Sequence, residues 1–510
     1  MLKLPHKVGI VQIVDGVFVP NSTYEAELSL QKEKASPTKH FDSDKSFGAM
    51  AILMQAAKRS FLLADLTAIY GHEQVSMAAN QIIKNTTAHH RFKAFTDSVA
   101  VLRDLPESID SPRLSEHCNA FGREVGRINQ LFRRRTVRMP DEEYLSFDST
   151  RISSEAKGLS DVRKGISKKG GYEKQIGLAI LYGHASGAPV MYRRFSGNVP
   201  DIKTLHDLLN RWDDLDIDKH VSVVFDRGYC SCENVRLLLQ HRHRFIMAAM
   251  TDHAYIRQVI EDHMPAFWDA SNNVHGFNVS GICCRTPVPS KSSADARLSV
   301  WVYCFYSLSQ AHTEQQQFFS DLEDFEEQWS RGLANEDCSL LKFYETPQSS
   351  PGACTLVRNH DAINNKTRYM GFFAMLSDRR RALDDVLTVY RTRDCIEKCF
   401  RRIKTDIGLN TTRAHSDGTV NARLLISFIA AAMVSWIVTS MQAPVTVGRK
   451  TFRPLSDEFS FMQLLDEVAQ IRLYGTCRGK NWLGEILVKH RQIFDRLGIS
   501  DALDDLATYK

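Results

Sequence analysis

Hydrophobic and polar residues recur with different periods along the first 140 residues of the chain. Residues 8–19 alternate around Asp15-Gly16, which predicts a β-hairpin with a two-residue turn. Residues 21–44 are polar and lack a period, so we expect a connector there. Residues 46–138 follow a helical period instead. Helices are predicted over residues 46–71, 73–84 and 114–132.

From Tyr144 onward the pattern is that of short strands separated by amphipathic helices. Three strands are followed by a helix, a strand, a helix and a strand, which indicates an α/β fold with a mixed sheet. The strands are predicted over residues 145–153, 175–182, 189–195, 220–225 and 244–249, and the helices over residues 201–215 and 232–241.

After Thr251 the pattern becomes strand-rich and irregular, so residues 251–378 are interpreted as an insertion. An acidic helix is predicted within it over residues 315–329. From Ala382 to the end the pattern is helical again. Candidate strands of the insertion cover residues 277–285, 298–306, 340–344 and 369–376.

Length and charge narrow the class of protein. A chain of 510 residues is long enough for two to four domains. Arginines crowd residues 133–138, whereas residues 314–337 hold eight acidic side chains and one arginine. This asymmetry fits one side that faces DNA and one that is solvated. The 11 cysteines include no C-x-x-C pair, which favours reduced thiols in a cytoplasmic protein.

One apolar stretch, Leu424 to Met441, approaches the length that spans a bilayer. Ser427, Ser435 and Thr439 interrupt it, and no comparable stretch occurs elsewhere in the sequence. We therefore expect a buried core helix and no membrane association. A membrane anchor is the alternative, and fractionation with membranes after a high-salt wash would support it.

Two aspartates lie where an α/β sheet places its ligands. Asp148 lies in the first strand of the sheet, and Asp226 directly follows a later apolar strand. Ligands bind at the ends of such strands, because the loops diverge there and leave a crevice. Aspartate at a strand end is also a common turn former or helix cap, so these two residues alone do not establish a site.

A third carboxylate comes from the predicted helix over residues 383–404. Tyr390, Arg393, Glu397 and Lys404 fall within an arc of roughly 60° on one helix face, and an apolar stripe borders that face. The alternative is a surface helix with ordinary arginine–glutamate pairs. Because the polar face borders the apolar stripe, we favour the interpretation that these polar groups form a line that binds a phosphodiester strand.

Three carboxylates are the ligands that Mg²⁺ and Mn²⁺ prefer. Two such ions about 4 Å apart can activate a water or 3′-hydroxyl on one side of phosphorus and stabilise the leaving oxygen on the other. Asp148, Asp226 and Glu397 are therefore the candidate catalytic residues and metal ligands.

The spacing Tyr390-x2-Arg393-x3-Glu397-x6-Lys404 resembles the YREK signature of insertion-sequence transposases of the DDE superfamily. Three other segments resemble that family as well, namely SFDST around Asp148, VVFDRGY around Asp226 and FSGNVPD at residues 195–201. The resemblance implies an α/β, RNase H-like mixed sheet flanked by helices, with a β-rich insertion and a helical N-terminal domain.

The resemblance also implies a division of the chain. We expect a hairpin and connector at residues 1–45, a helical DNA-binding domain at 46–140, the catalytic core at 141–250 and 379–441, the insertion at 251–378, and a C-terminal helical region at 442–510.

The activity implied by the resemblance is cut-and-paste transposition, with metal-dependent cleavage and strand transfer at transposon ends. Asp148, Asp226 and Glu397 would bind two Mg²⁺ or Mn²⁺ ions, and Tyr390, Arg393, Lys404 and Arg401 would contact DNA. Trp301 and Tyr390 are candidates for stacking on a flipped base. These are the site residues that we expect from the sequence.

The partners implied are transposon-end and target DNA, bound by a homodimer in a synaptic complex. The helices after Leu424 are candidates for the dimer contact, and the location would be the cytoplasm of a bacterium, at the nucleoid. Two other functions remain open: an RNase H-like nuclease without strand transfer, and a domesticated, non-catalytic DNA-binding protein. Intact carboxylates speak against the second.

Overall fold

The structure of the protein is a computed structural model. It describes residues 11–14, 17–20, 42–87, 92–102, 111–166, 171–214, 221–290, 298–335, 338–345, 356–447, 450–476 and 480–510. Strands β1 (Val11–Val14) and β2 (Val17–Pro20) pair antiparallel, as the predicted hairpin requires. The turn residues Asp15 and Gly16, and most of the expected connector, lie outside the described residues.

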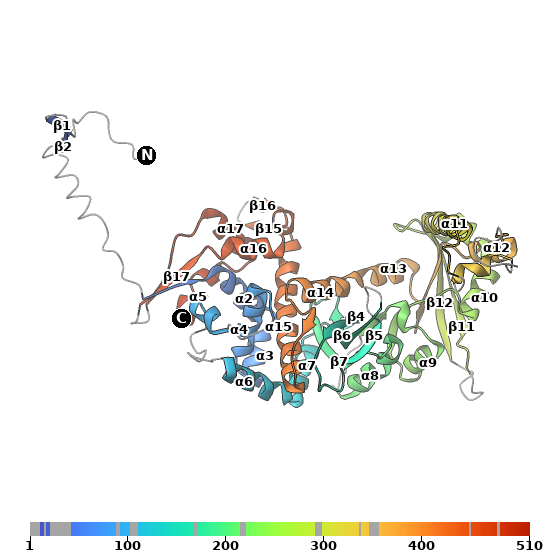
Figure 1. The fold of residues 1–510 in the computed structure, drawn as a ribbon, viewed down its shortest axis with the longest axis horizontal. Helices are drawn as coiled ribbons and strands as arrows, with labels where there is room; N and C mark the ends of the chain where they lie inside the picture. The colour runs from blue at the N-terminus through green and yellow to red at the C-terminus, as the bar shows by residue number, and fades with distance from the viewer. Residues whose placement is uncertain are drawn as a thin grey trace.

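A mixed sheet occupies the middle of the molecule (Figure 1). Its first five long strands are β4 (Tyr144–Ser154), β6 (Tyr172–Gly183), β7 (Pro189–Ser196), β8 (Ser222–Phe225) and β9 (Arg244–Ala249). They lie in the order β7-β6-β4-β8-β9, and β6 is antiparallel to its neighbours while β4, β8 and β9 are parallel. This is the arrangement of an RNase H-like sheet, so the predicted fold class is confirmed. An additional short strand, β5 (Arg163–Ile166), pairs with β6 and was not predicted.

The insertion extends the same sheet. Its strands are β10 (Asn273–Val274), β11 (Val279–Pro287), β12 (Ser299–Tyr306) and β13 (Phe372–Ser377). Because β13 pairs antiparallel with β9, the sheet continues without interruption from the core strands into the insertion. The insertion therefore adds width to the catalytic sheet.

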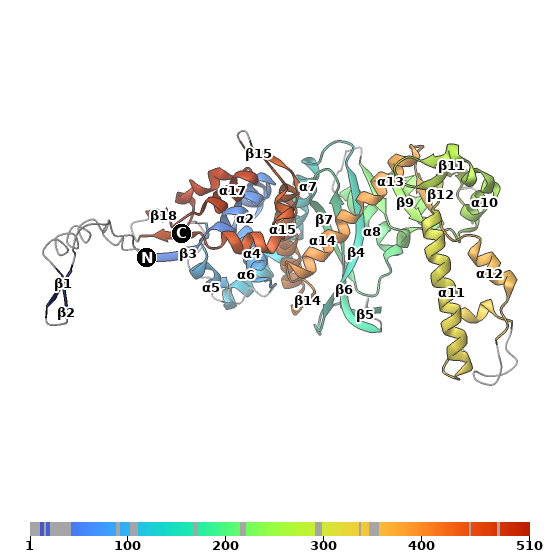
Figure 2. The same cartoon turned by 90° about the horizontal axis from the view of Figure 1, so that it is seen from above.

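Helices α10 (Ala254–Asp262), α11 (Leu308–Ser330) and α12 (His360–Thr367) complete the insertion, and α11 projects beyond the sheet (Figure 2). The strand expected at residues 340–344 is wrong, because Ser339–Phe343 forms a 3-10 helix. Phe343 packs edge-on against Phe318 of α11 at 4.9 Å between ring centroids, so this apolar segment is buried against a helix.

Alternation along the strands decides which helices cover which face. On β4, Phe147 points to the side of α8 (Asp201–Asp214) and α9 (Cys232–Gln240), where its ring packs on Tyr229. Its neighbour Asp148 points to the opposite face, because side chains alternate along a strand. Helices α13 (Leu383–Thr392) and α14 (Asp394–Thr405) cover that face.

The helix predicted over residues 383–404 is present but divided. Arg393 separates α13 from α14, and its backbone N–H donates to the carbonyl of Tyr390 at 3.0 Å, which is the tighter spacing of a 3-10 turn. The predicted apolar stripe comprises Val389, Ile396, Phe400 and Ile403; the three residues on α14 are buried, and Val389 is half-buried. Val386 and Leu387 of α13 are buried as well. The turn changes the direction of the polar face at Arg393.

The N-terminal helices pack around one central helix, α15 (Asp417–Gln442). It is long and apolar enough to cross a membrane by composition, but 78% of its apolar window is buried inside the protein. The prediction of a buried core helix is therefore confirmed. The same burial makes the residues after Leu424 in this helix unavailable for the dimer contact that we expected there.

Glycine allows α15 to approach the N-terminal helix α6 (Ser111–Arg123) closely. A Cβ on Gly122 would lie 1.9 Å from the carbonyl oxygen of Gly418, so the two backbones touch at this point. The other N-terminal helices are α2 (Gly48–Arg59), α3 (Leu62–Ile69), α4 (Glu73–Lys84), α5 (Phe92–Ser98) and α7 (Val125–Val137). The helix predicted over residues 46–71 is divided at Phe61, which has a left-handed φ of 60°.

The C-terminal region is not wholly helical, which corrects the prediction for residues 442–510. Besides α16 (Phe461–Val468) and α17 (Val488–Arg496) it contains strands β15 (Val445–Val447), β16 (Lys450–Phe452), β17 (Arg472–Gly475) and β18 (Asn481–Leu483). Strand β17 pairs with β3 (Ser43–Ser46), a partner more than 400 residues away that local periodicity does not indicate. Strand β3, helices α2 to α7 and the chain from α15 onward form one lobe, which we call the terminal lobe (Figure 1).

The arginine cluster on α7 holds this lobe together. Arg138 donates to both carboxylate oxygens of Asp65 at 2.7 and 3.0 Å, and Arg134 lies 3.6 Å from the same carboxylate. Arg135 donates to the backbone carbonyl of Ser60 at 3.3 Å, and burial lowers its pKa to about 10. The burial of Arg135 contradicts the expectation of a DNA-facing surface for that side chain, whereas Arg134 and Arg138 pair with Asp65 and stay partly exposed.

We expect Asp65→Ala to destabilise the protein by about 2–3 kcal/mol, because the side chain of Asp65 is 0% exposed and its loss leaves the arginines of α7 without their carboxylate. Chemical denaturation would measure the change. Asp501→Ala is the control, since its pair with Arg59 at 3.5 Å is exposed and should contribute less than about 0.5 kcal/mol. Equal effects for the two substitutions would contradict the assignment.

Candidate active site

Two neighbouring parallel strands place the aspartates side by side. Strands β4 and β8 pair with Phe147 opposite Phe225, so Asp148 and Asp226 are the next residues on each strand. Adjacent strands lie about 4.8 Å apart, and residues at the same level point to the same face. The strand register therefore brings both carboxylates to the face covered by α13 and α14.

A single guanidinium lies among three carboxylates. Arg393 approaches Asp148 at 3.6 Å, Asp226 at 3.8 Å and Glu397 at 2.6 Å between nitrogen and oxygen. The side chain of Arg393 is 12% exposed, so little water screens these contacts. Tyr390 donates its hydroxyl to Asp226 at 3.0 Å. The structure thus brings all three predicted carboxylates together, and Tyr390 and Arg393 with them.

The pKa of Asp148 is raised to about 6, because burial disfavours its charged form more than Arg393 favours it. The neighbouring carboxylate of Asp226 raises it further, whereas a hydrogen bond from the backbone of Ser149 lowers it. Burial also raises the pKa of Tyr390, so its hydroxyl stays protonated and donates. The site holds more negative charge than one arginine neutralises.

The donor set fits a divalent cation. Three carboxylates surround a point that already carries positive charge, and Mg²⁺ and Mn²⁺ take carboxylate ligands. With Arg393 among the carboxylates, no group of three acidic, histidine or cysteine side chains in the described part of the chain has the spacing of a metal site.

A fourth carboxylate lies behind Asp148 and was not singled out from the sequence. Asp201, at the start of α8, accepts hydrogen bonds from Ser149 and from Arg151, the latter at 3.1 Å. Arg151 also donates to the carbonyl of Val199 at 2.7 Å. Asp201 ends the FSGNVPD segment, so that motif could have indicated it.

The two basic residues expected to contact DNA lie further along α14. Lys404 is seven residues beyond Glu397, which is two turns or about 10 Å on the same face. Arg401 is exposed, one turn beyond Glu397. Neither lies in the cluster around Arg393. They continue the polar line away from the carboxylates.

Trp301 is not beside the carboxylates. Strand β12, which carries it, is three strand spacings from β8, or about 14 Å. The guanidinium of Arg380 lies 5.9 Å from the centre of its ring. Its expected role in stacking on a base near the carboxylates is not supported by this position.

The family of the chain follows from a match of its sequence. The model of the transposase DDE domain matches residues 139–433, more than half of the chain. The chain belongs to this family. Transposases of the family cut and transfer DNA and generally use divalent metal ions. No curated protein matches the chain.

Two solved transposase structures are similar to this chain. A piggyBac transposase synaptic complex with hairpin DNA has 10% identity and a TM-score of 0.36, covering 89% of this chain and 75% of that chain. A Mos1 transposase paired-end complex with the left transposon end has 13% identity and a TM-score of 0.16, covering 47% of this chain and 70% of that chain.

A cavity of about 930 Å³ opens beside the carboxylates of this DDE transposase. Asp226, Tyr390 and Arg393 line one side, and the insertion supplies the other. Arg257 and Tyr369 belong to that side, with the guanidinium 4.7 Å from the centre of the ring. The sequence did not single out these two residues, because α10 and the segment before β13 meet only in the fold.

We expect Asp148→Asn to stabilise the metal-free transposase more at high pH than at low pH. The pKa of Asp148 is 3.8 in the unfolded chain and about 6 in the folded state, so the folded state binds this proton more tightly. The free energy of unfolding therefore falls as the pH rises from 3.8 toward about 6. Between about pH 4.5 and pH 7.5 the advantage of the variant should grow by about 2 kcal/mol, measured by denaturation with a chelator present.

Asp394→Asn is the matched control for this measurement. Asp394 is half-exposed, lies on α14 and pairs with Lys398 at 2.6 Å. Its effect should vary little over this pH range. A difference between wild type and Asp148→Asn that stays constant with pH would show that burial does not raise the pKa of Asp148.

Proposed function

We propose that the protein catalyses DNA strand cleavage and strand transfer in cut-and-paste transposition of an insertion sequence. The observation that carries the proposal is the convergence of Asp148, Asp226 and Glu397, from β4, β8 and α14, around one guanidinium. Membership in the transposase DDE family supports this class of reaction. The proximity of the three carboxylates supports these residues as the ones that carry it out.

Asp148, Asp226 and Glu397 would hold two Mg²⁺ or Mn²⁺ ions. When bound, such ions lower the pKa of an attacking water and stabilise the negative charge that develops on the leaving 3′-oxygen. The raised pKa of Asp148 supports this role, because a cation would favour the charged form that burial disfavours.

The residues of the chain have separate tasks in this proposal. Tyr390 orients the carboxylate of Asp226 through its hydrogen bond. Arg393 neutralises the carboxylates in the DNA-free protein and turns to a phosphate of the DNA strand when other positive charge replaces it. Lys404 and Arg401 contact phosphates further along the strand. The polar line on α13 and α14 then holds the strand across the carboxylates.

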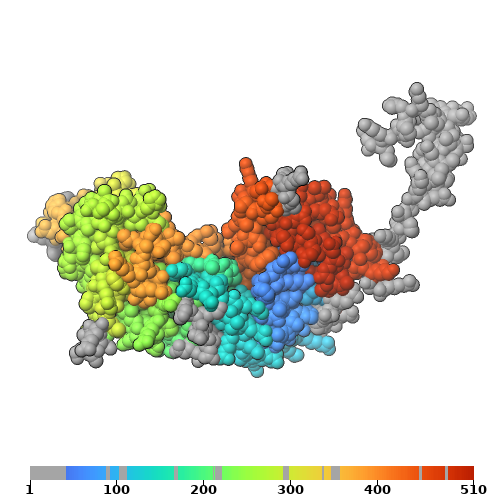
Figure 3. Space-filling model, turned by 180° about the vertical axis from the view of Figure 1, so that it is seen from behind, coloured from blue at the N-terminus to red at the C-terminus, as the bar shows by residue number. Residues whose placement is uncertain are grey.

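The shape of the surface supports a DNA path at this place. The molecule is hollowed between the insertion and the terminal lobe, and the segment around α13 and α14, shown in orange, lies at the floor of the hollow (Figure 3). A duplex end could enter there and reach both the carboxylates and the cavity beside Asp226.

We further propose that two copies of the chain hold two transposon ends, in the cytoplasm of a bacterium and at its nucleoid. The partners would be transposon-end DNA and target DNA, with end recognition in the terminal lobe. The dimer contact would have to use exposed surface outside α15, since that helix is buried within its own chain.

Incubation with DNA that carries the ends of the element, in the presence of Mg²⁺, tests the function directly. Nicks, hairpins and joined products together would support a transposase. Nicks without any joined product would favour an RNase H-like nuclease, which shares the carboxylate site. Binding without cleavage would favour a non-catalytic DNA-binding protein.

We expect Glu397→Gln to lower Mg²⁺-dependent cleavage by about a thousandfold and to leave the affinity for end DNA within about threefold of wild type. The amide keeps the size of the side chain but loses the charge that would bind the ion. Gel-based cleavage and binding assays measure the two quantities separately. Asp394→Asn, one turn earlier on α14, should retain both, and equal loss of binding and cleavage in Glu397→Gln would refute its role as a ligand.

We expect Lys404→Ala and Arg401→Ala each to weaken DNA binding and to reduce the slope of log affinity against log salt by about 0.9, because each removes one phosphate contact. Fluorescence anisotropy over a salt series measures the slope. Arg331→Ala is the control, because Arg331 pairs with Glu327 at the far end of α11. Slopes equal to wild type would show that neither side chain contacts DNA.

A further inference from the structure

We infer that Arg381 is a positioning residue that sets the α13–α14 segment against the two strands that carry the catalytic aspartates. The inference rests on the proposed function, since it concerns the geometry of the same carboxylates. It assigns a role to a residue that lies outside the YREK spacing and outside the cavity.

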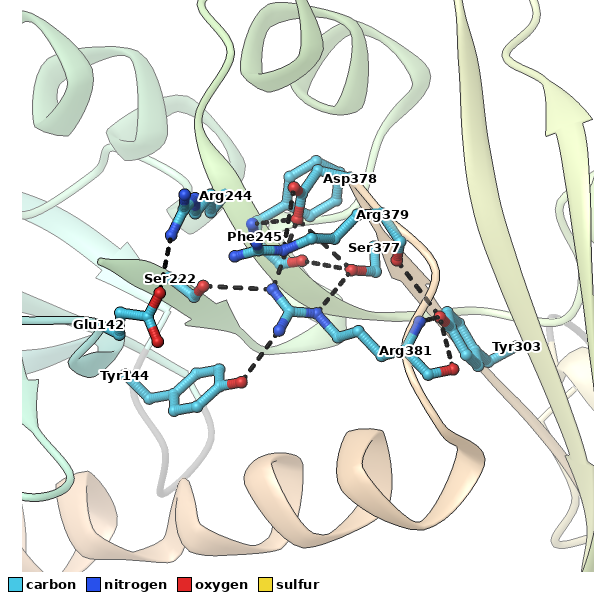
Figure 4. A network of polar contacts seen from close by, with 10 residues as sticks. All are labelled: Glu142, Tyr144, Ser222, Arg244, Phe245, Tyr303, Ser377, Asp378, Arg379 and Arg381. Carbon is cyan, nitrogen blue, oxygen red and sulfur yellow. Dashed lines mark hydrogen bonds and ion pairs between the residues drawn. The ribbon is translucent and has the colours of Figure 1, made fainter. Parts of the chain in front are cut away.

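The side chain of Arg381 contacts three elements at once (Figure 4). It donates to the hydroxyl of Tyr144 on β4 at 2.9 Å, to the hydroxyl of Ser222 on β8 at 3.2 Å and to the hydroxyl of Ser377 on β13 at 3.1 Å. Its distance to the carboxylate of Asp378 is 3.7 Å. The three hydrogen bonds use Nη1, Nη2 and Nε, so every arm of the guanidinium is engaged.

The backbone around Arg381 is fixed as well. Its N–H donates to the hydroxyl of Tyr303 at 2.6 Å, and that hydroxyl lies 3.3 Å from the carbonyls of Arg379 and Arg381. Asp378 accepts from the backbone N–H of Phe245 on β9 at 2.9 Å. The turn from β13 into α13 is therefore attached both to the core strands and to the insertion.

The partners of Arg381 are on the strands that matter for the site. Tyr144 precedes Asp148 by four residues on β4, and Ser222 precedes Asp226 by four residues on β8. Residues an even number apart on a strand share a face, so Arg381 holds the same face of each strand that presents the aspartates. Strands β4 and β8 are thus joined to α13 by one side chain.

Because Glu397 lies far from Arg381 along the α13–α14 segment, the position of Glu397 is sensitive to the orientation of this attachment. Glu397 is 16 residues beyond Arg381, and 14 of these residues lie in α13 and α14, which corresponds to about 21 Å of helix. A small rotation at Arg381 therefore displaces Glu397 relative to Asp148 and Asp226. Misplacement of a reacting group by about 1 Å can lower a rate by about a hundredfold. A merely structural arginine would affect folding but not the spacing of the carboxylates.

Lysine cannot replace Arg381 in this role. Its ammonium is a single point with three donors, whereas the contacts of Arg381 leave a planar fork in three directions. The side chain of Arg381 is 10% exposed, so a lysine would leave at least one buried hydroxyl without its donor. We therefore expect no rescue by the conservative substitution.

The test compares Arg381→Gln and Arg381→Lys with Arg496→Gln. Arg496 is the matched control, because its side chain is 5% exposed and donates to Glu458 and to the carbonyl of Arg453, in the terminal lobe. We expect all three variants to lower the melting temperature. Only the Arg381 variants should raise the Mn²⁺ concentration for half-saturation, measured by electron paramagnetic resonance, by about tenfold.

Cleavage kinetics give the second readout. In Arg381→Gln we expect kcat to fall by about 10- to 100-fold while KM for end DNA stays within about twofold, because the long side chains of Arg401 and Lys404 can still reach phosphates after α14 shifts by about 1 Å. Mn²⁺ affinity and kcat equal to those of Arg496→Gln would overturn the role of Arg381. A wild-type protein that neither binds Mn²⁺ nor cuts end DNA would overturn the proposed function itself, and the role of Arg381 with it.

Tyr144→Phe and Ser222→Ala keep the test decisive if the Arg381 variants do not fold. Each removes one hydroxyl and one of the hydrogen bonds of Arg381. We expect each to raise the Mn²⁺ half-saturation by about twofold to threefold, and Tyr144→Phe to add little in an Arg381→Gln background. Wild-type Mn²⁺ affinity in both single variants would overturn the inference.

Discussion

The arrangement of this protein depends on one electrostatic constraint, which is that three carboxylates share a partly buried site with a single arginine. Like charges at short range push one another toward protonation, and burial strengthens the effect. Asp148, whose side chain is 21% exposed, is the least exposed of the three and has the raised pKa. Arg393 makes the cluster possible in the metal-free protein. The remaining charge imbalance favours a further cation at this place, as the proposed function requires.

Holding such a cluster together requires rigid supports on three sides. The register of β4 with β8 sets the two aspartates, and it is determined by the apolar residues Phe147 and Phe225 beneath them. Glu397 comes from a helix whose start is set by the turn after β13. Because β13 pairs with β9, the insertion belongs to the support of the site and is joined to it by continuous backbone hydrogen bonds. A separate domain on a flexible linker could not position α13 in this way.

Much of this could be predicted from the sequence, for identifiable reasons. The strands β4, β7, β8 and β9 and the helix α4 follow from local periodicity, and the polar line on α13 and α14 follows from the spacing of Tyr390, Arg393 and Glu397. Each of these depends on residues close together in the chain. The sequence therefore predicted which carboxylates meet, and the structure places them within reach of one guanidinium.

The features that could not be predicted depend on partners that are distant in the sequence. Strand β17 exists because it pairs with β3, and the segment at residues 339–343 is helical because Phe343 packs on α11. The arginines at residues 133–138 suggested a DNA-binding surface, but Arg134 and Arg138 form ion pairs with Asp65 on α3. The pattern of charges along a chain does not show which charges are neutralised within the fold. That depends on whether an oppositely charged side chain from a distant segment lies beside them.

The same supports also determine which side of the cluster is accessible. Helix α14 packs on β4, on β6 and on α15, and α15 in turn packs on β7 and on the N-terminal helices, so the backbone that carries Glu397 is attached to both the sheet and the terminal lobe. At the start of α13, Arg381 attaches this segment to β4 and β8 through its hydrogen bonds to Tyr144 and Ser222. The carboxylates remain approachable from the cavity that Asp226, Tyr390 and Arg393 line. In the proposed function, a DNA strand that enters from this side would come within reach of Arg393, so the residue that neutralises the carboxylates in the DNA-free protein would also contact the incoming phosphate.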